Sequence, residues 1–386
     1  MKRIISLLLA ALLALSFLSC AAPGGNSDPT GEGSDNEFYT FDFCGSSGFS
    51  GRQQIFETED SVYYLCRNQD EVKKEIKYTV WVSDKTNKDW LPLCGRPNCL
   101  HDDKECNSLL EASQGGRIWL YGSHIYYSVD YLSLWRMKLD GSEHEEVYTF
   151  DRETMGRIGM VFFHNKYLII MGTGPEEDEV EFPIMHAYVL DLSENMLEPR
   201  EIELISEDGA NYFGTTIAGE GRYLYTALDD GRLIRFDLEA CTHEMLCTLP
   251  FCPDDWSAAL EGDELYIFDP WNSGLALKVN KLTGDIVSIK EAEPETEYWL
   301  TPANGFVVGV DYYGTNVYDY NCELVAKIPN AADGVMYSAE WILSGVVYGY
   351  EYVDGSEAIT TPPQWYLDLN EIGSPDMTWH KWAPED

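Results

Sequence analysis

Three cysteines and one histidine lie close together in the sequence, in the order Cys94-x4-Cys99-x-His101-x4-Cys106. Three thiolates and one imidazole can complete the tetrahedral shell of a zinc ion with a structural role. In a chain that leaves the reducing cytosol, two of these thiols can instead form a disulfide, for example Cys99 with Cys106. The spacing differs from the paired Cys-x2-Cys pattern, so a disulfide is slightly preferred to structural zinc. Either bond would fasten a cysteine-rich insertion at about residues 94–116.

The sequence carries none of the compact motifs that mark common catalytic sites. Residues 48–51 (Gly-Phe-Ser-Gly) lack the spacing of a nucleophile elbow, and residues 172–174 (Gly-Thr-Gly) lack the rest of a dinucleotide fingerprint. No HExxH pair is present, so a catalytic zinc of the metalloprotease type is not expected. We therefore name no catalytic residue and expect a non-catalytic protein.

Short alternating hydrophobic segments separated by turn residues fill residues 37–386, and no long segment repeats with the period of a helix. A tyrosine-rich strand followed by a second strand recurs along the chain, and each second strand ends at an aspartate or asparagine. These seven turn markers are Asp84, Asp140, Asp191, Asp237, Asn280, Asp319 and Asp368. Their spacing, 39 to 56 residues, predicts an all-β propeller of seven four-stranded blades, with six blades as the alternative.

In a propeller, the loops between the second and third strands share one face with the loops that join successive blades. The sequence places five aromatic residues in such loops: Tyr131, Trp256, Trp271, Tyr312 and Tyr313. Flat exposed rings can stack on sugar rings or contact a partner protein. These five residues are the candidate ligand contacts, with packing against neighbouring side chains as the alternative for each.

The first residues have the pattern of an export signal. Lys2 and Arg3 precede an apolar segment, 4–18, that is too short for a comfortable membrane span. The segment ends Phe-Leu-Ser-Cys20, which resembles the lipobox of bacterial lipoproteins and implies that Cys20 is lipidated and becomes the mature N-terminus. We therefore expect a lipoprotein signal peptide over residues 1–20.

The next segment, 21–36, is rich in glycine, serine, asparagine and proline and has no aromatic residue. Such a segment cannot bury apolar surface and is expected to be a flexible linker. The propeller is expected to follow it, over residues 37–386.

Two segments resemble known exported proteins. Residues 125–147 (IYYSVDYLSLWRMKLDGSEHEEV) resemble one blade of the TolB-like and low-density-lipoprotein-receptor-like propellers, which many exported lipoproteins of Gram-positive gut bacteria, of the Firmicutes type, carry. Residues 92–109 (PLCGRPNCLHDDKECNSL) resemble a cysteine-containing insertion of those lipoproteins. The resemblance implies a binding or scaffold protein at the cell surface. The blade count departs from it, because the receptor-like group usually has six blades.

The charge of the chain limits its partners. Sixty-six acidic residues against 26 basic ones give a formal charge of −40, which excludes a general nucleic-acid binder. We expect a lipid-anchored protein at the extracellular face of the cell membrane, with a soluble secreted protein as the alternative. Its expected function is non-catalytic binding or scaffolding of a glycan or a surface protein. The alternative is a carbohydrate-active enzyme, a glycosidase or lyase whose acids come from separate blades.

Overall fold

The chain divides into two units, Met1–Glu37 and Phe38–Asp386, and every residue described here belongs to the second. In this computed structural model the described residues run from 53 to 382. The gaps within that range are residues 71–74, 97, 102–104, 112–115, 129–131, 174–185, 195, 204–214, 229, 251–256, 270–274, 292–300, 304, 312–313, 331–335, 353–360 and 375–376. The predicted signal peptide and linker lie outside the described residues.

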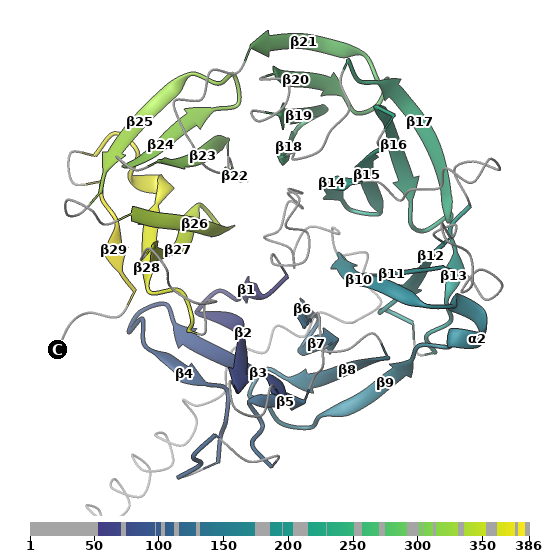
Figure 1. Cartoon of the computed structure of the whole chain (residues 1–386), viewed down its shortest axis with the longest axis vertical. Coiled ribbons are helices and arrows are strands. Elements are labelled where there is room, and N and C mark those ends of the chain that lie inside the picture. The colour runs from purple at the N-terminus through teal and green to yellow at the C-terminus, as the bar shows by residue number, and fades with distance from the viewer. Residues whose placement is uncertain are drawn as a thin grey trace, which may run out of the picture. The chain divides into compact units, whose positions relative to one another are not determined.

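The described strands form seven antiparallel sheets arranged around a centre as the blades of a propeller (Figure 1). Each blade is built from strands that are consecutive in the chain, with its first strand near the centre and its last strand at the rim. The first strands of neighbouring blades contact one another, as β14 does β18 and β18 does β22. The predicted all-β propeller with seven four-stranded blades is confirmed.

The first three blades contain β1 to β13. Blade 1 has β1 (Ile55–Glu57), β2 (Ser61–Asp70), β3 (Glu75–Asp84), β4 (Trp90–Pro92) and a short fifth strand, β5 (Leu109–Glu111). Blade 2 has β6 (Arg117–Tyr121), β7 (His124–Ser128), β8 (Ser133–Lys138) and β9 (Glu145–Thr149). Helix α2 (Arg152–Met155) leads to blade 3, with β10 (Ile158–His164), β11 (Tyr167–Gly172), β12 (His186–Asp191) and β13 (Arg200–Glu201).

The remaining four blades contain β14 to β29. Blade 4 has β14 (Thr215–Glu220), β15 (Tyr223–Ala227), β16 (Arg232–Asp237) and β17 (Thr242–Thr248). Blade 5 has β18 (Ser257–Glu261), β19 (Glu264–Asp269), β20 (Leu275–Asn280) and β21 (Ile286–Glu291). Blade 6 has β22 (Thr301–Ala303), β23 (Phe306–Asp311), β24 (Gly314–Asp319) and β25 (Leu324–Pro329). Blade 7 has β26 (Met336–Leu343), β27 (Val346–Tyr352), β28 (Trp365–Asp368), the 3-10 helix η1 (Leu369–Glu371) and β29 (His380–Lys381). No helix in the described ranges is long and apolar enough to span a membrane.

The seven turn markers all hold the same turn, the one that follows the third strand of each blade. In every blade the marker's side-chain oxygen accepts a hydrogen bond from the backbone N–H two residues later, at 2.7–3.1 Å. Aspartate and asparagine are suited to this turn because their short side chains reach the following backbone. The repeat that predicted the fold is therefore a repeated turn.

The middle strands of the blades are buried on both faces, because each blade packs between two neighbours. Strand β11 is buried along its whole length. Ile169 on this strand packs in a cluster with Phe236 of blade 4, whereas the next residue, Ile170, packs in a cluster with Tyr126 of blade 2. This arrangement explains why these strands are hydrophobic runs rather than a strict alternation of apolar and polar residues.

The ring closes between blades 7 and 1 through side chains. Trp382 is buried and packs on Tyr348, with ring centroids 5.1 Å apart, while its indole N–H donates to Ser83 Oγ at 2.7 Å. The hydroxyl of Tyr350 donates to that of Tyr64 at 2.9 Å. Because the two blades come from opposite ends of the described chain, these contacts hold the ring together.

We expect acid to destabilise the propeller in part through His164. Burial lowers the pKa of this side chain from 6.5 to about 4, although a hydrogen bond with the backbone of Gly221 acts in the opposite direction. Below pH 6.5 the imidazole is protonated in the unfolded chain but stays neutral in the folded one. The stability that the neutral His164 contributes above pH 6.5 is therefore lost as the pH falls through 4. Between pH 7.5 and 4.5 the loss attributable to His164 is roughly 2–3 kcal/mol.

Urea unfolding at the two pH values measures this loss. The variant His164→Gln, whose side chain does not titrate, should lose roughly 2–3 kcal/mol less than the native protein over the same interval. An equal loss in the two proteins would contradict the assignment.

Candidate functional site

The cysteine–histidine residues lie on a loop of blade 1, between β4 and β5. Both of these strands pair with β3, so the loop leaves and returns beside one strand. Val80 on β3 closes the neck of the loop: it accepts a hydrogen bond from the N–H of Leu93 at 2.8 Å and donates its own N–H to Ser108 at 2.8 Å. Cys94 and Cys106, which lie just inside this neck, are thereby brought close together.

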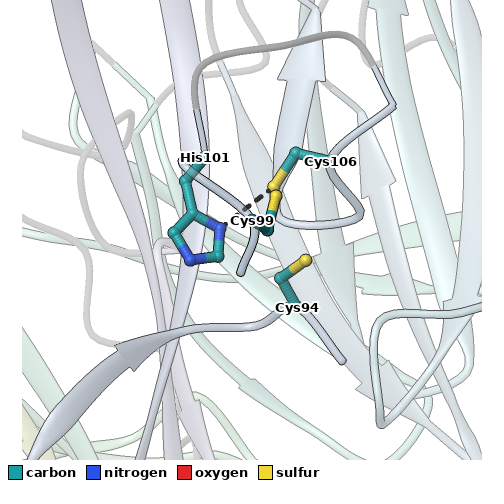
Figure 2. A group of neighbouring side chains, drawn as sticks. All are labelled: Cys94, Cys99, His101 and Cys106. Atoms are coloured by element: carbon teal, nitrogen blue, oxygen red, sulfur yellow. Dashed lines mark hydrogen bonds between the residues drawn. The ribbon is translucent and has the colours of Figure 1, made fainter. Parts of the chain in front are cut away.

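The four predicted residues converge inside the loop, as Figure 2 shows. Their candidate ligand atoms, three sulfurs and one imidazole nitrogen, all lie within 4.8 Å of one another. Nδ1 of His101 is 3.2 Å from Sγ of Cys106, which is buried, and the other three side chains are half-buried. Among the described residues this is the one group of three or more such side chains that is arranged to hold a metal ion.

Left-handed backbone turns direct the middle of the loop back toward its neck. Asn98 has a φ of 59° and His101 a φ of 55°, a region that residues other than glycine rarely occupy. Such strain persists where the surrounding structure holds it, and it is common at functional sites. These turns carry Cys99 and His101 back to the two cysteines at the neck.

The loop also supplies hydrogen-bond donors to sulfur. Burial alone would raise the pKa of Cys94, but the backbone N–H groups of Arg96 and Asn107 and the side chains of Cys106 and Cys99 outweigh it and lower this pKa. Donors aimed at a sulfur favour its thiolate, the form that binds metals. At Cys99 the backbone N–H of His101 acts in this direction, but burial and the neighbouring Cys106 and Cys94 outweigh it and raise the pKa.

Blade 2 supports the loop from the other side. Gly141, with a φ of 77°, lies so close to the loop that a Cβ there would be 2.6 Å from the carbonyl oxygen of Leu93. His144 forms hydrogen bonds with the hydroxyl of Tyr127 at 2.8 Å, with the carbonyl of Gly141 at 3.0 Å and with the backbone of Asn107. The loop is therefore packed at the junction of the first two blades.

Two chemistries fit this arrangement. The four side chains can surround one metal ion, or two of the three sulfurs can join in a disulfide. No disulfide links any of the seven cysteines in the described part of the chain. If a metal ion is held, all four positions of a tetrahedral shell come from the protein, so the site has no open position for water or substrate.

A second feature, not predicted from the sequence, is a band of exposed apolar side chains at the rim of blades 4, 5 and 6. Seven of the eleven large apolar residues that are exposed in the described ranges lie there. We call them the outer apolar rim: Met245, Leu282, Ile286, Val287, Ile289, Leu324 and Val325. Three of them lie on β21, the outermost strand of blade 5, which Figure 1 draws at the top of the ring.

The outer parts of blades 4, 5 and 6 contact one another. Gly284, in the turn before β21, lies against β17, where a Cβ would clash with the carbonyl oxygen of Leu246. Lys290 of β21 donates to the carbonyl of Asn321 and lies 4.0 Å from the carboxylate of Glu323, both in the turn before β25. The outer strands of the three blades, which carry the exposed apolar residues, are therefore in contact with their neighbours at these points.

The rim differs from the outer strand of blade 2. Strand β9 places Glu145 and Glu146 at its exposed positions, the charged residues that usually protect a sheet edge. Strand β21 exposes Ile286, Val287 and Ile289, together with Ser288 and Lys290. The two adjacent apolar residues at 286 and 287 break the alternation expected of a half-buried strand, and this break was the signal in the sequence.

The other predicted site residues lie outside the described residues. These are the lipidated Cys20 and the five aromatic candidates Tyr131, Trp256, Trp271, Tyr312 and Tyr313. Their roles stay predictions.

The chain is similar in fold to several solved structures, all at low identity. BamB from Moraxella catarrhalis is 11% identical, covering 77% of this chain and 90% of its own, with a TM-score of 0.42. Apo AztD from Citrobacter koseri is 12% identical, covering 73% and 87%, with a TM-score of 0.41. The acylaminoacyl peptidase of Pyrococcus horikoshii is 12% identical, with a TM-score of 0.49; 91% of this chain matches 54% of the peptidase, about half its length.

Structural similarity at such low sequence identity and TM-score assigns no function to the chain. No family model matches it, and no curated protein is similar to it in sequence. Its function must therefore be argued from its own residues.

Proposed function

We propose that this chain is a non-catalytic binding module, held at the extracellular face of the cell membrane, whose outer apolar rim binds a protein partner. The observation that carries this proposal is the concentration of exposed apolar residues on the rims of three successive blades. Exposed apolar residues gathered on one part of a surface are typical of interaction sites. Its aliphatic side chains suit a protein partner better than a glycan, because sugars bind best on flat aromatic rings.

The charge of the chain indicates the charge of the partner. With a net charge of −40, two copies of the chain repel each other, which disfavours self-association through the rim. The same field attracts a cationic protein and speeds its association. We therefore assign the rim to a positively charged partner, whose binding weakens as salt screens the attraction.

The form of the outer strands favours contact through side chains over addition of a strand. Strands β17, β21 and β25 each contain a register shift, which leaves Val287 and Val325 without a residue opposite them. A bulge distorts the outer edge and so hinders pairing with an incoming strand. The partner is then expected to pack on the exposed apolar side chains themselves.

The double variant Val287→Thr/Ile289→Thr tests the rim. Threonine keeps the β-branched shape that suits a strand, so the fold should be unchanged, but the apolar contact is lost. We expect the amount of partner that copurifies with the full-length protein from membranes, measured by quantitative mass spectrometry, to fall by about tenfold.

Met196→Thr is the control, because Met196 is even more exposed (72%, against 52% for Val287 and 54% for Ile289) but lies in blade 3, away from the rim. The control should retain its partner. Equal recovery from the native protein and the double variant, or equal loss from both variants, would overturn the proposal.

The anchor is assigned to Cys20, which follows the apolar segment of the signal peptide and precedes the linker. Two or more acyl chains hold a protein firmly on a membrane, whereas one holds it weakly. Metabolic labelling with a tagged fatty acid should label the native protein, and Cys20→Ala should lose the label almost completely. Cys44→Ala, the control, should keep it. An unlabelled native protein recovered from the medium would instead indicate the secreted form.

A further inference from the structure

We propose that Cys94, Cys99, His101 and Cys106 bind one zinc ion in a closed structural site. This inference is independent of the outer apolar rim, because it concerns a loop of blade 1. It reverses the preference for a disulfide that spacing alone favoured.

The distances between the four side chains fit a single ion. A tetrahedral zinc shell, with zinc–sulfur bonds of about 2.3 Å, places sulfurs about 3.8 Å from one another. The four ligand atoms already lie within 4.8 Å of one another, so small side-chain rotations complete the shell. Figure 2 shows the four side chains gathered inside the loop, with the imidazole of His101 facing Cys106.

The number of converging side chains favours a zinc site over a disulfide. A disulfide joins two of the three sulfurs. The third thiol and the imidazole of His101 then take no part in the cross-link. A tetrahedral ion uses all four. Nδ1 of His101 forms a hydrogen bond with Sγ of Cys106 at 3.2 Å; a disulfide gives this imidazole no role, whereas a tetrahedral ion takes it as the fourth ligand.

The backbone of the loop is built to hold the ligands in place. Backbone N–H groups two residues after Cys94 and Cys99, those of Arg96 and His101, bond to the preceding sulfurs. The hydroxyl of Ser108 lies 3.0 Å from Sγ of Cys106. Groups that orient the ligands in this way strengthen metal sites, because the ligands need not be reordered when the ion binds.

The chemistry of the donors selects zinc among the common divalent ions. Thiolates and imidazole are soft or borderline ligands that suit zinc, whereas calcium and magnesium require oxygen ligands. Binding converts three thiols to thiolates and releases three protons, with no change of oxidation state, and the site then carries a net charge of −1. Since all four positions are filled, the ion fastens the loop and does not catalyse.

Metal analysis of the full-length protein tests the assignment. We expect one zinc ion per chain by native mass spectrometry, and we expect cobalt(II) in place of zinc to give the intense visible absorption of a tetrahedral thiolate site. Cys99→Ser should lose most of the bound metal, whereas Cys241→Ser, which removes a cysteine outside the loop, should retain it. Circular dichroism establishes that both variants are folded.

Peptide mapping of the native protein under non-reducing conditions gives a readout that needs no variant. Zinc predicts that all three cysteines of the loop are alkylated once the metal is removed, without a reductant. A disulfide between any two of them, together with protein free of zinc, would overturn the proposal.

Discussion

Replacing Trp382 by alanine should lower the free energy of unfolding of the propeller by about 3–5 kcal/mol. Trp382 is 3% exposed and lies where blade 7 meets blade 1. Its ring lies 5.1 Å from that of Tyr348 and 6.0 Å from that of Trp90, and its N–H donates to Ser83. Alanine would leave a cavity at the closure of the ring and an unpaired hydroxyl within it.

Urea unfolding measures the effect, and two further variants separate its parts. Ser83→Ala removes only the hydrogen bond and should cost about 1 kcal/mol. The double variant Trp382→Ala/Trp90→Ala should cost less than the sum of the single variants, because the two rings contact each other. A loss below about 1 kcal/mol in Trp382→Ala would mean that the ring is held closed by other contacts.

Removing zinc with a chelator should open the loop between β4 and β5 while the ring stays folded. The loop is fastened at its neck by Val80, and inside the neck its two halves are joined by the exposed ion pair of Arg96 with Glu105 and by the proposed zinc ion. Without the ion, local opening becomes easier while the buried blades are unaffected. We expect trypsin to cleave after Lys104, within this loop, about tenfold faster in the chelated protein.

Cleavage after Arg152, an exposed residue in α2, serves as the internal control and should keep its rate. Restoring zinc should restore protection of the loop. An unchanged rate after chelation, with faster cleavage only after a thiol reductant is added, would show that a disulfide holds the loop.

Local patterns in the sequence predicted the fold well. The turn markers, such as Asp140 and Asn280, act through backbone groups two residues away, so their role can be read without knowledge of distant contacts. The cysteine–histidine group is equally local, since its members lie between residues 94 and 106. Both predictions depended on short-range chemistry.

Features that depend on long-range pairing could not be predicted in the same way. The neck of the loop requires that both β4 and β5 pair with β3, which no local pattern specifies. The outer apolar rim depends on which strand of each blade becomes outermost. The exposure of Val287 and Ile289 on β21 follows from the packing of whole blades.

The most direct test of the binding function is photo-crosslinking from the rim on intact cells. A photoreactive residue in place of Ile289 should give one dominant adduct with a basic protein, and that adduct should weaken as the salt concentration rises. The same residue in place of Met196 should not give it. No adduct from position 289, the same adduct from both positions, or an adduct between two copies of this chain would contradict the account.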